Sequence, residues 1–238
     1  MKTIGLIGGM SWESTLLYYQ TINREIGRRL GGLHSGKVLL HSMDFEAVVR
    51  GQKAGNWDAL AAMLAEAGRG LEAAGADCLL IGTNTMHRVA REVQAAVDVP
   101  LLHIADVTAA AINAAGCVKV ALLGTRYTME QPFYIEHLAA QGIECIVPPE
   151  DHRAEVHRII FEELCKGQVT AASRQSLQDI IAHACARGAQ GAVLACTELP
   201  LSLRQSDVDV QLFDTTELHA LAAVEFALKG GPQVALPD

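Results

Sequence analysis

The sequence has no long hydrophobic run and no block rich in lysine or arginine. No segment approaches the roughly 18 consecutive apolar residues that a membrane-spanning helix needs. The 238 residues carry a formal net charge of −8 at pH 7, which argues against nucleic acid or an anionic membrane as the main partner. The apolar start of "MKTIGLIGG" is too short for a signal peptide, because Gly8 and Gly9 interrupt it. We therefore expect a cytoplasmic protein that has no nucleic-acid or membrane partner.

Several motifs of known chemistry are also absent. The chain has six cysteines but no C-x-x-C pair, so neither a zinc knuckle nor a thioredoxin-type site is indicated. The nucleotide-binding patterns G-x-G-x-x-G and G-K-[ST] are missing, and so is the G-x-S-x-G elbow of serine hydrolases. His152 and His157 are five residues apart, which misses the i,i+4 spacing of helical metal ligands. No metal and no organic cofactor is expected.

What the sequence does contain is an alternation of short apolar runs and longer amphipathic ones. Near-continuous apolar runs of this length are typical of parallel strands buried on both faces. The segments between them have helical periodicity, as in 57–75 and 173–188, and Gly75 and Gly188 fall where glycines end helices. The pattern predicts an α/β fold with parallel sheets. The strands are expected at residues 3–8, 37–43, 77–82, 100–105, 119–124, 145–149, 191–196 and 210–214.

The sequence also contains an internal repeat, in which three segments of the first half have similar counterparts in the second half. "GLIGGMSWEST" (5–15) is similar to "ALLGTRYTMEQ" (121–131), and "GADCLLIGTNT" (75–85) is similar to "GAQGAVLACTE" (188–198). "PLLHIAD" (100–106) parallels "VQLFDTT" (210–216) in the same order. From these repeats we infer two homologous halves whose matching strand ends face one another. Ligands bind outside the carboxyl ends of parallel strands, so a ligand is expected at these strand ends. The tail 230–238 is expected to fray.

Cys196 ends one of these strands and precedes an expected helix start at 197–200. Unpaired N–H groups at a helix N-terminus lower the pKa of a nearby thiol, so we expect Cys196 to form a thiolate near neutral pH. The alternative is an ordinary buried cysteine at a strand end. In the other half, Thr83 occupies the matching position.

Small polar groups surround both positions. Thr83-Asn84-Thr85 and Cys196-Thr197-Glu198 offer backbone N–H groups and short side chains that suit a carboxylate. The alternative is that both are turns that only cap helices. The glycine-rich turn at 5–15 allows the backbone to approach a small anion, and its counterpart carries Thr125 and Thr128.

With "GLIGGMSWEST", "GTNTMH", "LLGTRYT" and "ACTEL" in this order, the chain resembles the aspartate/glutamate racemase family of cofactor-independent racemases, in particular its aspartate branch. The resemblance implies two pseudo-symmetric, flavodoxin-like α/β halves with the active site in the cleft between them, and a homodimer. We expect one domain from residues 1–105 plus 215–238, completed by the C-terminal helix, and a second from 106–214. The residues that the resemblance points to as contacts of a small amino-acid substrate are Met10, Ser11, Gln52, Asn84, Thr85, Thr125, Thr128, Thr197 and Glu198. Lys166 is a further candidate for contact with an acidic substrate, or it is only a solvated residue at a helix end.

The family pattern uses two cysteines on opposite faces of the substrate Cα, one to remove a proton and one to return a proton. The second cysteine falls on Cys196, whereas the first falls on Thr83. A threonine hydroxyl is too weak an acid to supply a base near neutral pH, but it can donate a proton to a carbanion. The prediction is racemisation of an L-amino acid, aspartate or glutamate, with Cys196 as the base, the Thr83 side as the reprotonation face, and the L-to-D direction kinetically favoured.

Two alternatives stay open at this point. Relatives with a single functional cysteine are decarboxylases or isomerases of small diacids, which form the carbanion by breaking or moving a different bond. The loss of the first thiol is equally compatible with a carboxylate-binding protein that catalyses nothing.

Overall fold

The computed structural model describes residues 1–229, so the prediction made for the tail 230–238 lies outside the described residues. The chain forms two compact units, each with its own parallel sheet. The first unit comprises residues 1–82, 89–102 and the described chain from His219 onward, and the second comprises 83–88 and 103–218. Within residues 1–229, no helix is both long and apolar enough to cross a membrane.

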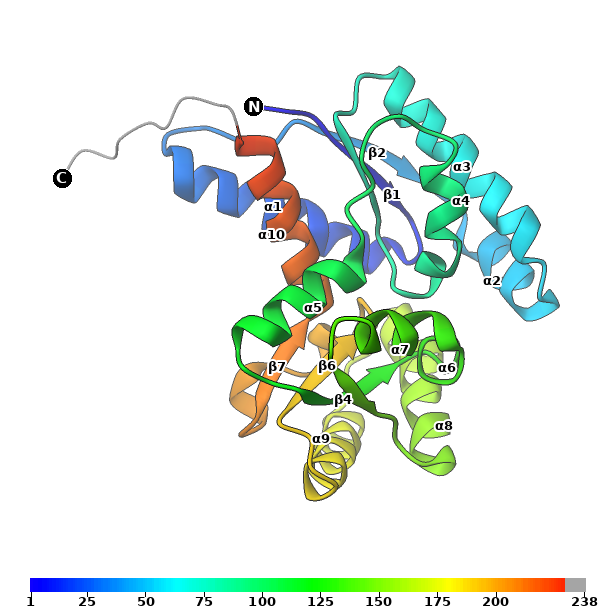
Figure 1. Ribbon diagram of the computed structural model, residues 1–238, viewed down its shortest axis with the longest axis vertical. Coiled ribbons are helices and arrows are strands. Elements are labelled where there is room, and N and C mark those ends of the chain that lie inside the picture. The colour runs from blue at the N-terminus through cyan, green and yellow to red at the C-terminus, as the bar shows by residue number, and fades with distance from the viewer. Residues whose placement is uncertain (230–238) are drawn as a thin grey trace. The chain divides into compact units, whose positions relative to one another are not determined.

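The first unit is built around a three-stranded sheet in the order β2-β1-β3. On one face, Ile4 and Leu6 pack with side chains of two helices into a single apolar cluster. These helices are α1 and α10, and α3 and α4 lie on the opposite side (Figure 1). The elements are β1 (Ile4–Gly8), α1 (Trp12–Leu30), β2 (Val38–Ser42), α2 (Phe45–Ala54), α3 (Trp57–Ala73), β3 (Cys78–Ile81), α4 (Ala90–Gln94) and α10 (Thr215–Leu228).

The second unit has a four-stranded sheet in the order β5-β4-β6-β7. Side chains alternate between its faces: Val120 and Leu122 pack in the cluster with α5 and α7, whereas Ala121 and Leu123 pack with α8 and α9. The elements are α5 (Ile104–Ala114), β4 (Lys119–Gly124), α6 (Arg126–Glu130), α7 (Pro132–Ala139), β5 (Glu144–Ile146), α8 (Glu150–Arg158), α9 (Ala171–Ala186), β6 (Gly191–Ala195) and β7 (Gln211–Asp214). Shorter helical turns are η1 (Thr85–Val89), η2 (Ile159–Glu163), η3 (Leu164–Lys166), η4 (Leu199–Leu201) and η5 (Gln205–Asp207).

The predicted repeat is visible in the two sheets. β1 is paired with β2 and β3 exactly as β4 is paired with β5 and β6, and all these pairs are parallel. In the second unit β7 then pairs with β6, and in the first unit Leu101 forms a single parallel bridge to Leu79 of β3. The α/β class with two small parallel sheets flanked by helices is therefore confirmed.

Two details of the strand prediction are wrong. Residues 100–105 form no strand beyond the bridge at Leu101, because His103 caps a helix that starts at Ile104: its Nδ1 accepts a hydrogen bond from the N–H of Ala105 at 3.2 Å. β2 is not buried on both faces, because it is an edge strand, and Leu40 is 50% exposed. The helix ends at Gly75 and Gly188 are confirmed, and both glycines have the positive φ (96° and 100°) that an L side chain disfavours.

Candidate active site

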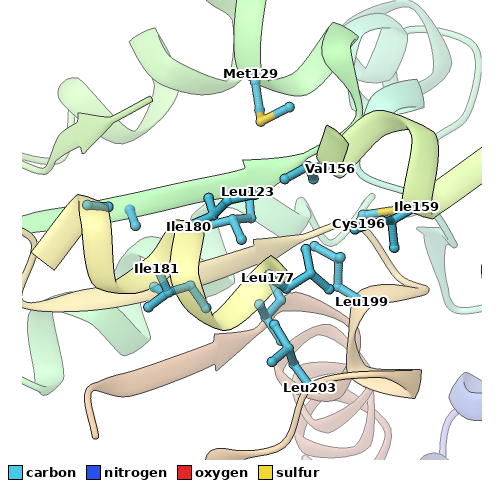
Figure 2. Close-up of a cluster of buried hydrophobic side chains, with 14 of the residues drawn as sticks. Leu123, Met129, Val156, Ile159, Leu177, Ile180, Ile181, Cys196, Leu199 and Leu203 are labelled. Carbon is cyan, nitrogen blue, oxygen red and sulfur yellow. The ribbon is translucent and has the colours of Figure 1, made fainter. Parts of the chain in front are cut away.

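Cys196 lies directly after β6, with 5% of its surface exposed. Figure 2 shows it at one end of the apolar cluster that fills the space between the sheet, α8 and α9. Leu177 and Leu199 belong to the same cluster and are fully buried. The sulfur is therefore held in a dry environment, which disfavours its charged form.

The thiol has a carboxylate partner two residues away. Cys196 Sγ–H donates a hydrogen bond to Glu198 Oε2 at 2.9 Å, and Thr197 Oγ1 donates to the same oxygen at 3.1 Å. Burial raises the pKa of the Cys196 thiol well above its ordinary value, and the negative charge of Glu198 raises it further. The backbone N–H of Glu198 donates toward the sulfur and lowers the pKa, but this effect is smaller.

This electrostatic balance corrects the expectation that Cys196 titrates near neutral pH by itself. The predicted helix start at 197–200 is only the three-residue 3-10 turn Leu199–Leu201, which is too short to provide the N-terminal field of an α-helix. Desolvation and the neighbouring carboxylate therefore outweigh the one backbone N–H. A thiolate at this position requires that the proton be taken by a nearby base.

The segment after β3 is anchored to the second unit, although β3 belongs to the first. Asn84 Nδ2 donates to Thr215 Oγ1 at 2.9 Å, and Thr215 Oγ1 donates in turn to the carbonyl of Leu194 at 2.8 Å. Leu194 lies in β6, two residues before Cys196. Residues 83–88 and Cys196 are thus parts of one compact unit, joined by a chain of buried hydrogen bonds.

The same chain fixes the orientation of the Asn84 amide. Thr215 Oγ1 gives its only hydrogen to Leu194, so it must accept from Asn84, and the NH₂ group of Asn84 must face it. Asn84 Oδ1 therefore points the other way. Asn84 is 1% exposed, and among the described residues its Oδ1 has no hydrogen-bond donor. A buried acceptor of this kind requires a donor from a ligand or an ordered water.

Three threonine hydroxyls form a compact cluster beside this segment. Thr85 Oγ1 lies 2.8 Å from Thr125 Oγ1 and 3.5 Å from Thr128 Oγ1, and the last two atoms are 3.2 Å apart. Thr125 also caps α6, since its hydroxyl accepts from the N–H of Thr128 at 3.4 Å. All three residues are buried. The structure thus brings Thr85, Thr125 and Thr128 together, as the sequence pattern suggested.

The predicted residues of the first unit are described separately. Met10 and Ser11 are buried between β1 and α1, and the Ser11 carbonyl accepts from Ser14 Oγ and Thr15 Oγ1. Gly9 precedes them with φ 82°, and a Cβ there would lie 2.4 Å from the backbone of Met43. Gln52 is buried within α2. The turn is therefore closely packed, and only glycine fits at position 9.

Lys166 lies at the end of η3 and is exposed. Whether Lys166, Gln52 or the first-unit turn contacts a substrate stays a prediction.

One group of side chains in the described chain brings three potential metal-ligand atoms within 4.8 Å of one another: His103, Asp106 and His137. The centroids of the two imidazole rings are 4.4 Å apart and the angle between their planes is 1°, so the in-plane lone pairs of the two rings lie in parallel planes and do not meet at one point. His103 Nδ1 accepts from the backbone, and His137 Nε2 lies 2.6 Å from Asp106 Oδ1. The geometry is that of a stacked pair of rings with one hydrogen-bonded contact to a carboxylate, which does not suit a metal centre.

Sequence reasoning missed Thr215. Thr215 is fully buried and bridges Asn84 to β6. A signal for it was present, since "VQLFDTT" closes the third pair of repeated segments at the carboxyl end of a strand. Nothing in the sequence shows that Asn84 reaches a residue 131 positions away.

The profile of the family described as Asp/Glu/Hydantoin racemase matches residues 7–223. The chain belongs to this family. A crystal structure of a candidate Asp/Glu racemase from Yersinia pestis is 48% identical, covers 96% of this chain and 100% of its own, and superposes with a TM-score of 0.89. An aspartate racemase homologue from Pyrococcus horikoshii OT3 is 38% identical, with 95% and 99% coverage and a TM-score of 0.83.

A curated relative, the broad specificity amino-acid racemase RacX of Bacillus subtilis (strain 168), is 29% identical over 157 residues, which span 65% of this chain and 66% of RacX. Family membership and the two structural relatives identify an amino-acid racemase, which is an isomerase.

Proposed function

We propose that the protein racemises an acidic amino acid, aspartate or glutamate, by removing the Cα proton with Cys196 and returning a proton from the side of Thr83. The observation that carries this proposal is the buried hydrogen bond from the Cys196 thiol to Glu198 Oε2 at 2.9 Å. A thiol with a raised pKa needs a base beside it to become a nucleophile or a proton acceptor, and Glu198 is placed to be that base. In this proposal Cys196 deprotonates the L-enantiomer, which starts turnover in the L-to-D direction.

The proton movements can be followed on this chain's own side chains. Glu198 takes the proton of the Cys196 thiol, and the resulting thiolate takes the Cα proton of the substrate. The carbanion that remains is stabilised by its carboxylate, which the hydroxyls of Thr85, Thr125 and Thr128 suit as hydrogen-bond donors. The hydroxyl of Thr83, or a water that it orients, gives a proton to the opposite face and is then reprotonated by solvent, while Glu198 releases to solvent the proton that it took from Cys196.

The burial of the residues around Thr83 is consistent with this role. Asn84 and Thr85 are buried, with 1% and 4% of their surface exposed, whereas Thr83 is only partly buried. Of residues 83–85, Thr83 is therefore the one whose side chain remains accessible to a small molecule. Because its hydroxyl is a poor base, deprotonation should begin on the Cys196 side.

The free acceptor on Asn84 favours an amino acid over a simple diacid. The α-ammonium group of an amino acid is a donor that can satisfy Asn84 Oδ1, whereas a dicarboxylate offers only further acceptors to it. This distinction argues against the alternative of a diacid decarboxylase or isomerase. The acidic side chain of the substrate is proposed by analogy with the racemase relatives.

Chiral product analysis over a panel of L-amino acids tests the proposal, with Cys196→Ala as the inactive variant. Cys185→Ala is a matched control, because Cys185 lies in the last turn of α9, before β6, at the opposite end of that strand from Cys196. We expect D-aspartate or D-glutamate from the wild type and from the control, and none from Cys196→Ala. Ligand binding with no product from any amino acid would favour a carboxylate-binding protein instead.

Deuterium incorporation from D₂O tests the order of the steps. The equilibrium constant of racemisation is unity, so kcat/KM must be equal in the two directions and only the individual constants can differ. Under saturation, the L-substrate should exchange its Cα proton faster than the D-substrate. Equal rates of exchange would contradict a single competent base.

A further inference from the structure

His87 is a buried histidine that the chemistry described above does not use. It lies in η1, and 4% of its surface is exposed. Its Nδ1 lies 2.8 Å from the carbonyl oxygen of Thr83, and its Nε2 lies 3.1 Å from the backbone nitrogen of Ile104. One imidazole therefore connects the backbone of Thr83 with the first residue of α5.

These two contacts define the protonation state of the ring. The N–H of Ile104 can only donate, so Nε2 must offer a lone pair, and the carbonyl of Thr83 can only accept, so Nδ1 must carry the hydrogen. The neutral Nδ1–H tautomer is the form that satisfies both partners. In the Nε2–H tautomer or the imidazolium, an N–H group would point at the N–H of Ile104.

Ile104 connects this bridge to the strand that carries Cys196. It is fully buried and packs in the same apolar cluster as Val193 and Ala195 of β6. Ala195 is the residue immediately before Cys196. The path from Thr83 through His87 and Ile104 to β6 lies wholly within the second unit.

We propose that His87 is a positioning residue, which in its neutral Nδ1–H form sets the backbone of Thr83, and through it the reprotonation face, relative to Cys196. This inference rests on the proposed racemase function. The ring of His103 stands edge-on to His87, with centroids 4.6 Å apart at 73°, and so limits rotation of the imidazole. The two hydrogen bonds that Glu198 Oε2 accepts come from Cys196 Sγ and Thr197 Oγ1, so we expect the Cys196–Glu198 pair to be retained when the bridge is lost.

The expected effect is on the fate of the carbanion. With Thr83 displaced, deprotonation by Cys196 continues, but delivery of a proton to the opposite face slows. Misplacement of a reacting group by about 1 Å can reduce its rate roughly 100-fold. The ratio of D-product formed to deuterium exchanged into recovered L-substrate should therefore fall by about 10- to 100-fold.

The variants separate hydrogen bonding from packing. His87→Phe keeps a planar ring against His103 but has neither donor nor acceptor, whereas His87→Gln has both. His183→Phe serves as the control, since His183 is an exposed histidine of α9. We expect His87→Phe to lower the product-to-exchange ratio, His87→Gln to restore part of it, and His183→Phe to leave it unchanged.

The measurement is incubation of L-substrate in D₂O, with chiral separation and mass spectrometry of both enantiomers. A His87→Phe enzyme that loses exchange and product in equal proportion would show a merely structural role and overturn the inference, while leaving the proposed function in place. A wild-type enzyme that neither exchanges nor racemises any amino acid would overturn both. Nitrogen-15 NMR of histidine-labelled wild-type protein, with the His87 resonances assigned by their absence from the His87→Phe spectrum, should show the Nδ1–H tautomer for His87, and the Nε2–H tautomer or an imidazolium at pH 7 would overturn the inference.

Discussion

Two partly buried groups of the second unit, His103 and Asp214, should make its stability depend on pH in opposite directions. Burial lowers the pKa of His103 from 6.5 to about 4, and the neighbouring His137 lowers it as well. Burial raises the pKa of Asp214 from 3.8 to about 6, although hydrogen bonds from the N–H groups of Glu217 and Thr216 oppose the rise. Each group therefore disfavours its charged form in the folded protein.

The sign of each contribution follows from which state binds more protons. Between pH 4 and 6.5 the unfolded chain binds more protons at His103, so this contribution to stability is complete above pH 6.5 and is lost as the pH falls toward 4. Between pH 3.8 and 6 the folded chain binds more protons at Asp214, so this contribution is present below pH 3.8 and is lost as the pH rises through 6. At 1.36 kcal/mol per pKa unit, each changes the free energy of unfolding by about 2 kcal/mol between pH 4.5 and 7.

His103→Asn and Asp214→Asn isolate the two contributions. Asparagine at position 103 preserves the N-cap acceptor of α5, and asparagine at position 214 preserves an acceptor for the two N–H groups. Relative to wild type, His103→Asn should gain about 2 kcal/mol of stability as the pH falls from 7 to 4.5, and Asp214→Asn should lose about 2 kcal/mol over the same change. A change in the free energy of unfolding that is the same at every pH reflects altered packing at the substituted residue, and it is subtracted from the difference curve.

Urea denaturation at several pH values, followed by circular dichroism, measures both difference curves. His183→Asn is the control, because His183 is an exposed histidine of the same unit. Difference curves for His103→Asn and Asp214→Asn that are flat within about 0.5 kcal/mol would refute the reasoning, since they would show that neither group is desolvated by folding. Curves of the same sign would refute the assignment of at least one group.

Three further changes test the site and the core. Glu198→Gln retains the shape of the side chain but removes the base for Cys196, and should lower kcat by about 10²- to 10⁴-fold in the chiral assay; an unchanged kcat would rule out this role. Thr83→Cys should speed deuterium exchange into the D-substrate, and no gain would contradict the assignment of Thr83 to the opposite face. Leu177→Ala removes a fully buried side chain from the cluster around Cys196 and should cost about 2–5 kcal/mol in urea denaturation; a much smaller loss would mean that the cluster can collapse.

Much of the fold could be predicted because a parallel strand that is buried on both faces consists of consecutive apolar residues. β1, β4 and β6 are such strands, and each was found within a residue or two of its observed ends. The run at 100–105 was misread because its apolar character is shared by the first turn of α5, and the decisive signal was the capping by His103. The exposure of β2 could not be predicted from its amino-acid composition, because an edge strand and a central strand can contain the same residue types.

The sequence points to the residues of the candidate site, but it does not show which of them are joined by hydrogen bonds. Strand ends and internal repetition point to Thr83, Asn84 and Cys196 as candidate positions. The attachment of the segment 83–88 to the second unit depends on Asn84 meeting Thr215, which are 131 residues apart. The direction of the Cys196 pKa was predicted wrongly, because burial by side chains such as Leu177 depends on packing that no local motif encodes.

The raised pKa of Cys196 has a consequence for the proposed chemistry. A thiol that ionises reluctantly is rarely a thiolate, but the thiolate that does form is a stronger base than an exposed one, which helps against a Cα proton of very high pKa. Glu198 offsets the scarcity of the thiolate, because its proton transfer occurs over 2.9 Å without solvent. When the proton moves, the negative charge of the pair passes from Glu198 to Cys196, and a bound α-ammonium group would stabilise the thiolate by its positive charge. In the proposed mechanism, the buried thiol of Cys196 gives a strongly basic thiolate, and the carboxylate of Glu198 forms that thiolate by taking its proton. The hydroxyl of Thr83 is too weak an acid to become a base in this way, so its proposed role is to give a proton.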